Sequence, residues 1–189
     1  MRTPQKIILS LIILILIGGG LFWYFFQQRS ELSTQLEVKT QKTMKLESPI
    51  FENNGNIPSK YTCDGGNVNP PLEIREVPEN AKSLVLIVDD PDAPMGTWVH
   101  WTVWNISPKT TEISENSVPE GAVEGITDFG KPGYGGPCPP SGTHRYFFKL
   151  YALNTTLDLD SSAKAKDIEK AMEGHILDKA ELIGLYSRQ

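Results

Sequence analysis

Proline and glycine interrupt the chain so often after Met44 that most of it reads as strands and loops. These residues gather in four stretches, NIPSKYTCDGGNVNPPL, EVPEN, PDAPMG and GKPGYGGPCPPSGT. Short runs rich in β-branched and aromatic residues lie between them, at residues 83–88, 98–106 and 145–153. Because short strands at such spacing are typical of two packed sheets, the pattern predicts an all-β sandwich.

The last part of the chain carries a different pattern. The stretch DSSAKAKDIEKAMEG is rich in good helix formers, and its apolar residues Ile168 and Met172 recur at helical spacing. Asp160 or Ser161 is a suitable N-cap, and Gly174 is a suitable terminator. We therefore predict a short helical C-terminal tail that packs on the β body.

The N-terminal stretch IILSLIILILIGGGLFWYFF, residues 7–26, contains no charged residue. As a helix with a rise of ~1.5 Å per residue it would reach about 30 Å, the thickness of one bilayer core. Arg2 and Lys6 precede it, so the positive-inside rule puts the residues after Gln28 on the outer side. The sequence predicts a transmembrane signal anchor at residues 1–27 and a single-pass protein of the cell membrane with its C-terminal domain outside the cytoplasm.

A cleaved signal peptide is the alternative, and it would leave the domain in the same compartment. The chain has no alanine before Ala81 for an A-x-A-like cleavage site and no cysteine before Cys63 for a lipid anchor, which favours the uncleaved anchor. Residues 28–45 are polar and poor in large apolar side chains, which predicts a flexible tether. Residues 46–189 have the length of one globular domain.

Charge and motif content disfavour two classes of protein. The net charge is −5 and the 18 lysines and arginines are scattered, so we expect no nucleic-acid partner. The chain has no G-x-S-x-G elbow, H-E-x-x-H, C-x-x-C or P-loop motif. We expect a binding protein without a cofactor rather than an enzyme.

Two of the three histidines lie in predicted strands, directly after turn-rich loops. Strict alternation of side chains puts His100 on one aromatic-rich face with Thr102 and Trp104, and it puts His144 on another with Tyr146. Loops held by a rigid scaffold often present binding groups, so both histidines are candidate ligand-binding residues. The alternative is that both are hydrogen-bonded histidines of the core.

Long motifs in a fixed order carry a family resemblance. DDPDAP followed by WVHW, then TDFGKPGYGGPCPPSGTHRYFFKLYAL and finally AMEGHILDKAELIGLYSR resemble the phosphatidylethanolamine-binding protein family, in its bacterial Raf kinase inhibitor-like branch. YTCDGGNVNPPLEI fits the same branch, and the resemblance covers roughly residues 48–188. It implies two antiparallel sheets in a Greek-key-like sandwich with a few helices, and a small surface pocket for anions such as phosphate or a phospholipid head group.

The resemblance also implies which residues form this pocket. They come from the acidic loop, the strand after it, the glycine-rich loop and the last strand motif, and they are Asp90, Asp92, Pro94, His100, Tyr134, Gly136, His144 and Tyr146. Because proline fixes φ near −65°, the prolines of the acidic loop would hold its carboxylates in one arrangement.

Each group in the implied pocket has an expected role. His100 and His144 would donate N–H bonds to phosphoryl oxygens, Tyr134 its hydroxyl, and Gly136 its backbone N–H. The acidic-loop carboxylates would orient the histidines, accept turn hydrogen bonds or hold the ammonium end of a zwitterionic ligand. Asp89 is interpreted as a solvated turn residue and Arg145 as structural, and His175 is expected to lie outside the pocket.

The two cysteines form the only possible pair. Cys138 lies in GGPCPP, where many family members have a small residue, and Cys63 lies in YTCDGG. A compartment outside the cytoplasm favours a disulfide. Two free thiols are the alternative, because the sequence does not show whether the two Cα atoms lie within ~7 Å.

Three classes of function follow from the residues and the resemblance. The favoured one is a binding module for a phosphoryl or other anionic head group. The second is an inhibitor or regulator of an extracytoplasmic protein partner, such as a protease or kinase. The third is a hydrolase or two-His-one-carboxylate metal site that uses His100, His144 and an aspartate.

Overall fold

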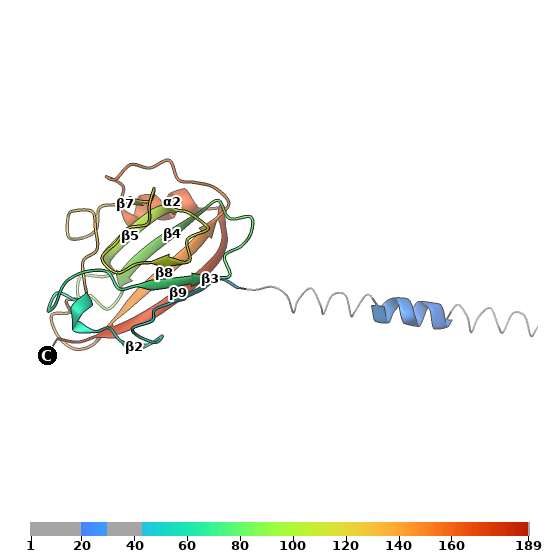
Figure 1. Ribbon diagram of the computed structural model, residues 1–189, viewed down its shortest axis with the longest axis horizontal. Coiled ribbons are helices and arrows are strands. Elements are labelled where there is room, and N and C mark those ends of the chain that lie inside the picture. Colours follow the sequence, from blue (N-terminus) through green and yellow to red (C-terminus); the bar gives the residue numbers. More distant parts are fainter. Residues whose placement is uncertain (1–19, 30–42, 189) are drawn as a thin grey trace, which may run out of the picture. The chain divides into compact units, whose positions relative to one another are not determined.

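The computed structural model describes residues 20–29 and 43–188 of the 189-residue chain. Contacts between Cα atoms divide the chain into two compact units, Met1–Lys42 and Thr43–Gln189 (Figure 1). In the first unit, residues 20–29 form a helix. The apolar and aromatic side chains at positions 21–26 of this helix are 53–73% exposed.

The predicted membrane segment begins outside the described residues. It comprises residues 7–26, and the predicted tether, residues 28–45, also lies mostly outside them. Among the helices that are described, none combines the length and the apolar character needed to cross a bilayer. The anchor and the tether therefore stay predictions.

The second unit is built mainly from two β-sheets, as predicted. The small sheet has the strand order β1 (Lys45–Glu47), β3 (Leu72–Arg75), β6 (Glu112–Ile113). The large sheet has the order β2 (Gly55–Asn56), β9 (Ile176–Tyr186), β8 (His144–Leu153), β4 (Ser83–Asp90), β5 (Trp98–Ile106), β7 (Val123–Glu124). All pairs are antiparallel except β2 and β9, which pair in parallel, so the large sheet is mixed rather than purely antiparallel.

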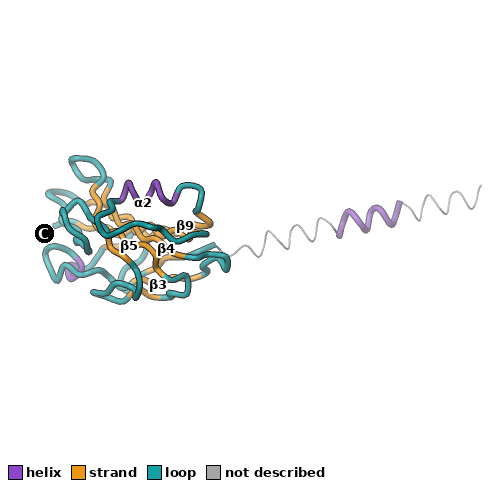
Figure 2. The backbone as a smooth tube through the Cα atoms, turned by 90° about the horizontal axis from the view of Figure 1, so that it is seen from above, coloured by secondary structure: helices purple, strands orange, loops and turns teal. Residues whose placement is uncertain are grey.

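The large sheet is covered on both faces. Figure 2 shows α2 (Ala165–Met172) and β3 on opposite sides of β4 and β5. Leu84, Leu86 and Val88 of β4 pack into the core between the two sheets, whereas Val85 and Ile87 pack toward α2. Because β4 is buried on both faces, its apolar run is continuous and does not alternate with polar residues.

The C-terminal part departs from the predicted helical tail. The helix exists, with Ile168 and Met172 buried, but its N-cap is Lys164 rather than Asp160 or Ser161. The chain then continues into β9, which pairs with β8 along its whole length. Residues 176–186 therefore form a strand of the large sheet, because they gain a full ladder of backbone hydrogen bonds there.

Candidate functional site

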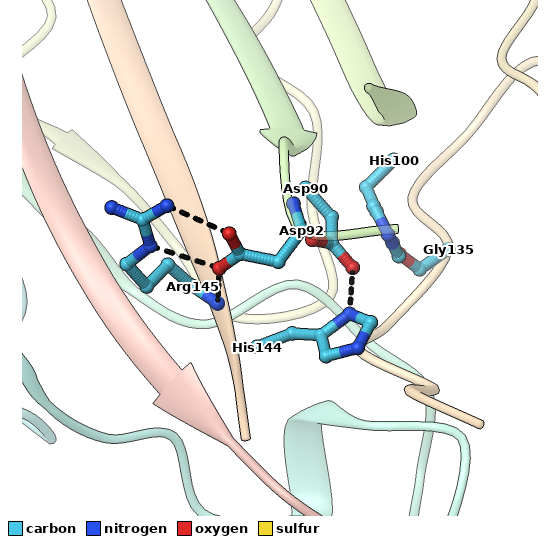
Figure 3. A network of polar contacts seen from close by, with 6 residues as sticks. All are labelled: Asp90, Asp92, His100, Gly135, His144 and Arg145. Carbon is cyan, nitrogen blue, oxygen red and sulfur yellow. Dashed lines mark hydrogen bonds and ion pairs between the residues drawn. The ribbon is translucent and has the colours of Figure 1, made fainter. Parts of the chain in front are cut away.

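The ends of three strands of the large sheet meet near the predicted pocket residues. Asp90 at the end of β4 pairs with Trp98 at the start of β5, and Asp89 pairs with Phe147 near the start of β8. The antiparallel register thus brings the acidic loop, the start of β5 and the start of β8 to one end of the sheet. Figure 3 shows the polar groups gathered there.

A β-bulge turns His100 toward this site. Val88 pairs with Trp101 and Asp89 pairs with Val99, so His100 is the extra residue on its strand. In a bulge two residues oppose one, and the strict alternation of side chains is broken.

The bulge corrects the predicted faces of β5. Trp104 packs in the apolar cluster under α2, and Thr102 pairs with Ile87, which belongs to the same cluster. His100 instead packs edge-on against Tyr146, a residue of the core between the sheets, with ring centroids 5.2 Å apart. His100 therefore does not share its face with Thr102 and Trp104.

Asp90 fixes both a histidine and a turn. Its Oδ2 lies 2.7 Å from Nδ1 of His144, and both residues are buried (Figure 3). Its Oδ1 accepts the backbone N–H of Asp92 at 2.8 Å. Because a carboxylate only accepts hydrogen bonds, Nδ1 of His144 carries a proton and its Nε2 points away from Asp90.

His100 and Gly135 exchange two hydrogen bonds. Nδ1 of His100 lies 2.6 Å from the carbonyl oxygen of Gly135, and the N–H of Gly135 donates to the carbonyl of His100 at 2.9 Å. Burial lowers the pKa of His100 from its usual value, partly offset by the Gly135 carbonyl and nearby carboxylates. The neutral ring therefore keeps its proton on Nδ1, and its Nε2 is an acceptor until a second proton binds.

Tyr146 places a buried hydroxyl beside Asp90. The residue is 1% exposed, and both the Asp90 carboxylate and the Cys138 backbone lie near enough to its hydroxyl to affect the pKa of Tyr146. Burial raises the pKa of Tyr146, and the negative charge of Asp90 raises it further. The phenol thus stays protonated. It lies two positions along β8 from His144 and in contact with His100.

Asp92 is engaged by Arg145 rather than by either histidine. The Asp92 carboxylate accepts three bonds from Arg145, one from its backbone N–H and two from its guanidinium, at 2.7–3.0 Å (Figure 3). These bonds lower the pKa of Asp92 to about 2. Pro94 is exposed in the loop beyond. This ion pair agrees with the interpretation of Arg145 as structural, which stays a prediction.

We expect Asp92→Asn to lower the free energy of unfolding by about 1 kcal/mol at pH 7. A pKa lowered from 3.8 to about 2 would correspond to about 2 kcal/mol, but the Arg145 side chain is 53% exposed and solvent screens the pair. Because the folded-state pKa is lowered, the difference from wild type should vanish as the pH falls from about 4 to 2. Urea unfolding of the wild type and of Asp92→Asn across this pH range measures the difference in unfolding free energy.

The matched control is Glu73→Gln, which removes a carboxylate from the exposed pair with Arg75. It should change the unfolding free energy by no more than a few tenths of a kcal/mol, as is usual for surface pairs. An Asp92→Asn effect no larger than this control would show that the Arg145 pair does not stabilise the loop.

Tyr134 and Gly136 donate their hydrogens within the protein. The Tyr134 hydroxyl donates to the carbonyl of Tyr61 at 3.0 Å, and the N–H of Gly136 donates to Oδ1 of Asn67 at 2.7 Å. A Cβ on Gly136 would lie 2.7 Å from the Tyr61 carbonyl oxygen, so this position needs glycine. Both residues therefore anchor the glycine-rich loop to residues 61–67 in this structure.

A disulfide completes this anchor. Cys63 and Cys138 are bonded, with their Cα atoms 5.4 Å apart, and the N–H of Cys63 donates to the carbonyl of Pro137 at 3.1 Å. The loop that carries Gly135, the partner of His100, is thus held at several points.

Asp89 differs from its interpretation, and His175 lies outside the site. Asp89 is not a solvated turn residue: it lies inside β4, is 4% exposed, and its Oδ2 lies 2.6 Å from Nζ of Lys149. His175 is exposed and its Nδ1 contacts Asn154, at the end of β8 opposite to His144.

Sequence reasoning did not single out two neighbours of His100. The Phe129 ring packs edge-on against the imidazole, with centroids 5.3 Å apart. Gly135 acts only through its backbone, and a Cβ there would lie 2.2 Å from the Phe129 ring. Within residues 20–29 and 43–188, no group of three His, Cys, Asp or Glu side chains is placed to hold a metal ion.

Comparisons with known proteins cover the second unit. The family model described as phosphatidylethanolamine-binding protein matches residues 47–187. A UPF0098 protein of Methanothermobacter thermautotrophicus is 55% identical over 150 residues, which cover 77% of this chain and 99% of that protein. A UPF0098 protein of Aquifex aeolicus is 51% identical over 152 residues, 77% of this chain and 89% of that protein.

Two solved structures are similar as well. The putative phosphatidylethanolamine-binding protein homologue CT736 of Chlamydia trachomatis has a TM-score of 0.75 at 42% identity, with 78% of this chain and 99% of that one covered. E. coli YbcL, described as a new member of the mammalian PEBP family, has a TM-score of 0.74 at 32% identity, with 78% of this chain and 100% of that one covered.

Proposed function

The chain belongs to the phosphatidylethanolamine-binding protein family, and we propose that its domain binds a small anion, phosphate or a phospholipid head group, at the meeting point of β4, β5 and β8. The observation that carries the proposal is that Asp90 and Gly135 each engage Nδ1 of a buried histidine here, which leaves Nε2 of His144 and of His100 for a ligand. These two histidines would be charged donors once their Nε2 atoms are protonated.

The contacts made by Asp90 and Gly135 support the proposed role of the two histidines as donors to an anion. Asp90 holds Nδ1 of His144 and Gly135 holds Nδ1 of His100, so in both rings Nε2 is left for a ligand. A ring oriented through one nitrogen presents the other in a fixed direction, which lowers the entropic cost of binding.

We also propose that the domain is held at the outer face of the cell membrane by residues 7–26. The uncharged run and the positive residues before it support the anchor. The Cys63–Cys138 bridge fits an oxidising compartment. A flexible tether of the predicted length would let the domain reach about 20 to 25 Å from the membrane, near enough for head groups.

A titration followed by NMR tests the anion site. The full-length chain, kept in a polyoxyethylene detergent because residues 7–26 are apolar, is titrated with phosphate and then with phosphoethanolamine. The side-chain signals of His100 and His144 should shift together and saturate. The double variant His100→Ala, His144→Ala should lose saturable binding at every concentration tested.

His175→Ala is the matched control, because His175 is the third histidine and lies at the other end of β8. It should bind like wild type. Unfolding curves of all variants separate lost binding from lost folding. If neither ring shifts with either ligand, the two residues are core histidines and the anion site is refuted for these ligands.

A second function has one observation in its favour. Met95 is 92% exposed and Phe129 is 42% exposed, both on loops next to the site. Exposed apolar side chains of this kind are common at protein contact surfaces. The anion site would then regulate a surface that binds an extracytoplasmic protein. A pull-down with the double histidine variant tests whether binding of such a partner requires His100 and His144.

A further inference from the structure

Two stretches of the chain match the acceptor pattern for N-linked oligosaccharides, which is Asn-x-Ser or Asn-x-Thr with any middle residue except proline. They are Asn105-Ile106-Ser107 and Asn154-Thr155-Thr156. Because this pattern also arises by chance, the fold decides which asparagine can serve. An enzyme that attaches the sugar must reach the side-chain amide nitrogen, Nδ2, and the hydroxyl of the third residue.

The fold uses both polar atoms of the Asn105 side chain. Its Nδ2 donates to the carbonyl of Leu157 at 2.9 Å, and its Oδ1 accepts the N–H of Leu157 at 2.8 Å. Asn105 also lies inside β5, with its backbone in the left-handed region at a φ of 56°. An enzyme could reach this Nδ2 only by breaking the pair of bonds to Leu157, so the folded domain protects the first pattern.

Asn154 differs in each of these respects. It is an exposed residue directly after the end of β8. Its Oδ1 lies 2.8 Å from Nδ1 of His175, and its backbone N–H donates to the carbonyl of His175 at 3.0 Å. In the part of the chain that the structure describes, its Nδ2 makes no hydrogen bond. The side chain is thus held through its oxygen, while the reactive nitrogen stays unbonded.

Thr156, the third residue of the second pattern, is exposed as well. The loop that carries it is held by its neighbours, since the carbonyl of Thr155 accepts the hydroxyl of Ser83 and the N–H of Leu157 is bonded to β5. Neither bond involves the side chain of Asn154 or of Thr156. The loop therefore presents both groups that the acceptor pattern requires, and the fold of the described residues does not depend on them.

We propose that the domain carries an N-linked oligosaccharide on Asn154, transferred from a lipid-linked donor. Nδ2 forms a bond to C1 of the first sugar, the bond between C1 and the phosphate oxygen of the lipid breaks, and an amide proton passes to a base of the transferring enzyme. The inference rests on the position outside the cytoplasm proposed above, because glycosylation of this kind belongs to secreted and surface proteins. It does not rest on the anion site.

The oligosaccharide would leave the anion site open. Asn154 follows the last residue of β8, whereas His144 is the first of the 10 residues of this strand. At a rise of ~3.3 Å per residue, the two positions lie about 33 Å apart along the strand. We therefore expect the glycosylated and the unglycosylated chain to bind phosphate with equal affinity.

An enzymatic assay tests whether the fold selects Asn154. The full-length chain, kept in polyoxyethylene detergent, is incubated with a lipid-linked oligosaccharide and a single-subunit oligosaccharyltransferase that accepts Asn-x-Ser and Asn-x-Thr. Peptides of residues 101–111 and 149–159 are treated in parallel, and mass spectrometry locates the sugar. Both peptides should be modified, whereas the folded chain should be modified at Asn154 but not at Asn105.

Three substitutions at exposed positions sharpen the assay. Thr156→Ala removes the required hydroxyl and should abolish the modification, whereas Thr156→Ser keeps a hydroxyl and should retain it. Ser107→Ala disrupts only the first pattern, so it is the matched control and should be modified like wild type. The inference is overturned if Asn154 of the folded chain is not modified, if its peptide is not modified, or if Thr156→Ala is modified like wild type.

Protein purified from its own cells shows whether Asn154 is occupied. The peptide that contains Asn154 should carry the mass of an oligosaccharide, and a membrane-impermeant amine label added to intact cells should reach the lysines of the domain. A labelled domain with an unmodified Asn154 would refute the glycosylation and leave the position outside the cytoplasm standing. A domain that the label does not reach would refute that position, and the glycosylation with it.

Discussion

Replacing Cys63 and Cys138 with serine is expected to lower the free energy of unfolding by about 4 kcal/mol. The bridge joins residues 75 positions apart, and closing a loop of this size removes much of the conformational freedom of the unfolded chain. The native loop would keep its other ties, because the Tyr134 and Gly136 hydrogen bonds do not involve sulfur. The loss should therefore appear as lower stability rather than as a rearranged fold.

Urea unfolding with and without reductant measures this effect. Reductant should bring the wild-type protein to the stability of the double serine variant and leave the variant unchanged, since the chain has only 2 cysteines. Thiol labelling of the natively expressed protein without reductant should find no free thiol. Two labelled thiols, or a wild type indifferent to reductant, would contradict the bridge.

The strands of the large sheet could be predicted because their sequence pattern is local. The predicted run at residues 98–106 is β5, and the predicted runs at 83–88 and 145–153 are β4 and β8 with small extensions. The extension of β4 changes the interpretation of the acidic residues most. Asp89 and Asp90 look like turn residues in DDPDAP, but they pair with Val99 and Trp98 and are buried.

β9 could not be recognised in the same way. Gly174 predicts the end of the helix before this segment, but residues 176–186 mix charged with apolar side chains, so nothing local predicts a strand there. They form a strand because β8 offers a free edge along their whole length. Tertiary pairing of this kind overrides weak local preference.

The sequence predicted several residues of the candidate site, but it did not predict the contacts between them. The family motifs point to His100, His144 and Tyr146, which the structure brings together. The bulge at His100 and the backbone carbonyl of Gly135 leave no mark in the sequence, because one depends on register and the other carries no side chain. Tyr134 and Gly136 have suitable donors, yet the fold uses them to anchor a loop.

The state of His100 leads to the last prediction. Burial lowers its pKa, so the ring is neutral at pH 7, and its Nδ1 proton is committed to Gly135. Nε2 of the neutral ring can accept a hydrogen bond but cannot donate one to an anion. Binding of a fully ionised anion must therefore bring a proton to His100, and the cost of this proton falls as the pH falls.

We expect the affinity for sulfate, which does not titrate between pH 8 and pH 6, to rise as the pH falls, by about tenfold per pH unit for one proton taken up. Calorimetry of the full-length chain in two buffers with different ionisation enthalpies counts the protons. In His100→Gln the amide can donate without titrating, so the slope should be lower by about one proton, whereas His175→Ala should keep the wild-type slope. An affinity independent of pH in the wild type would mean that sulfate does not contact Nε2 of His100, and the site would then bind anions without this residue.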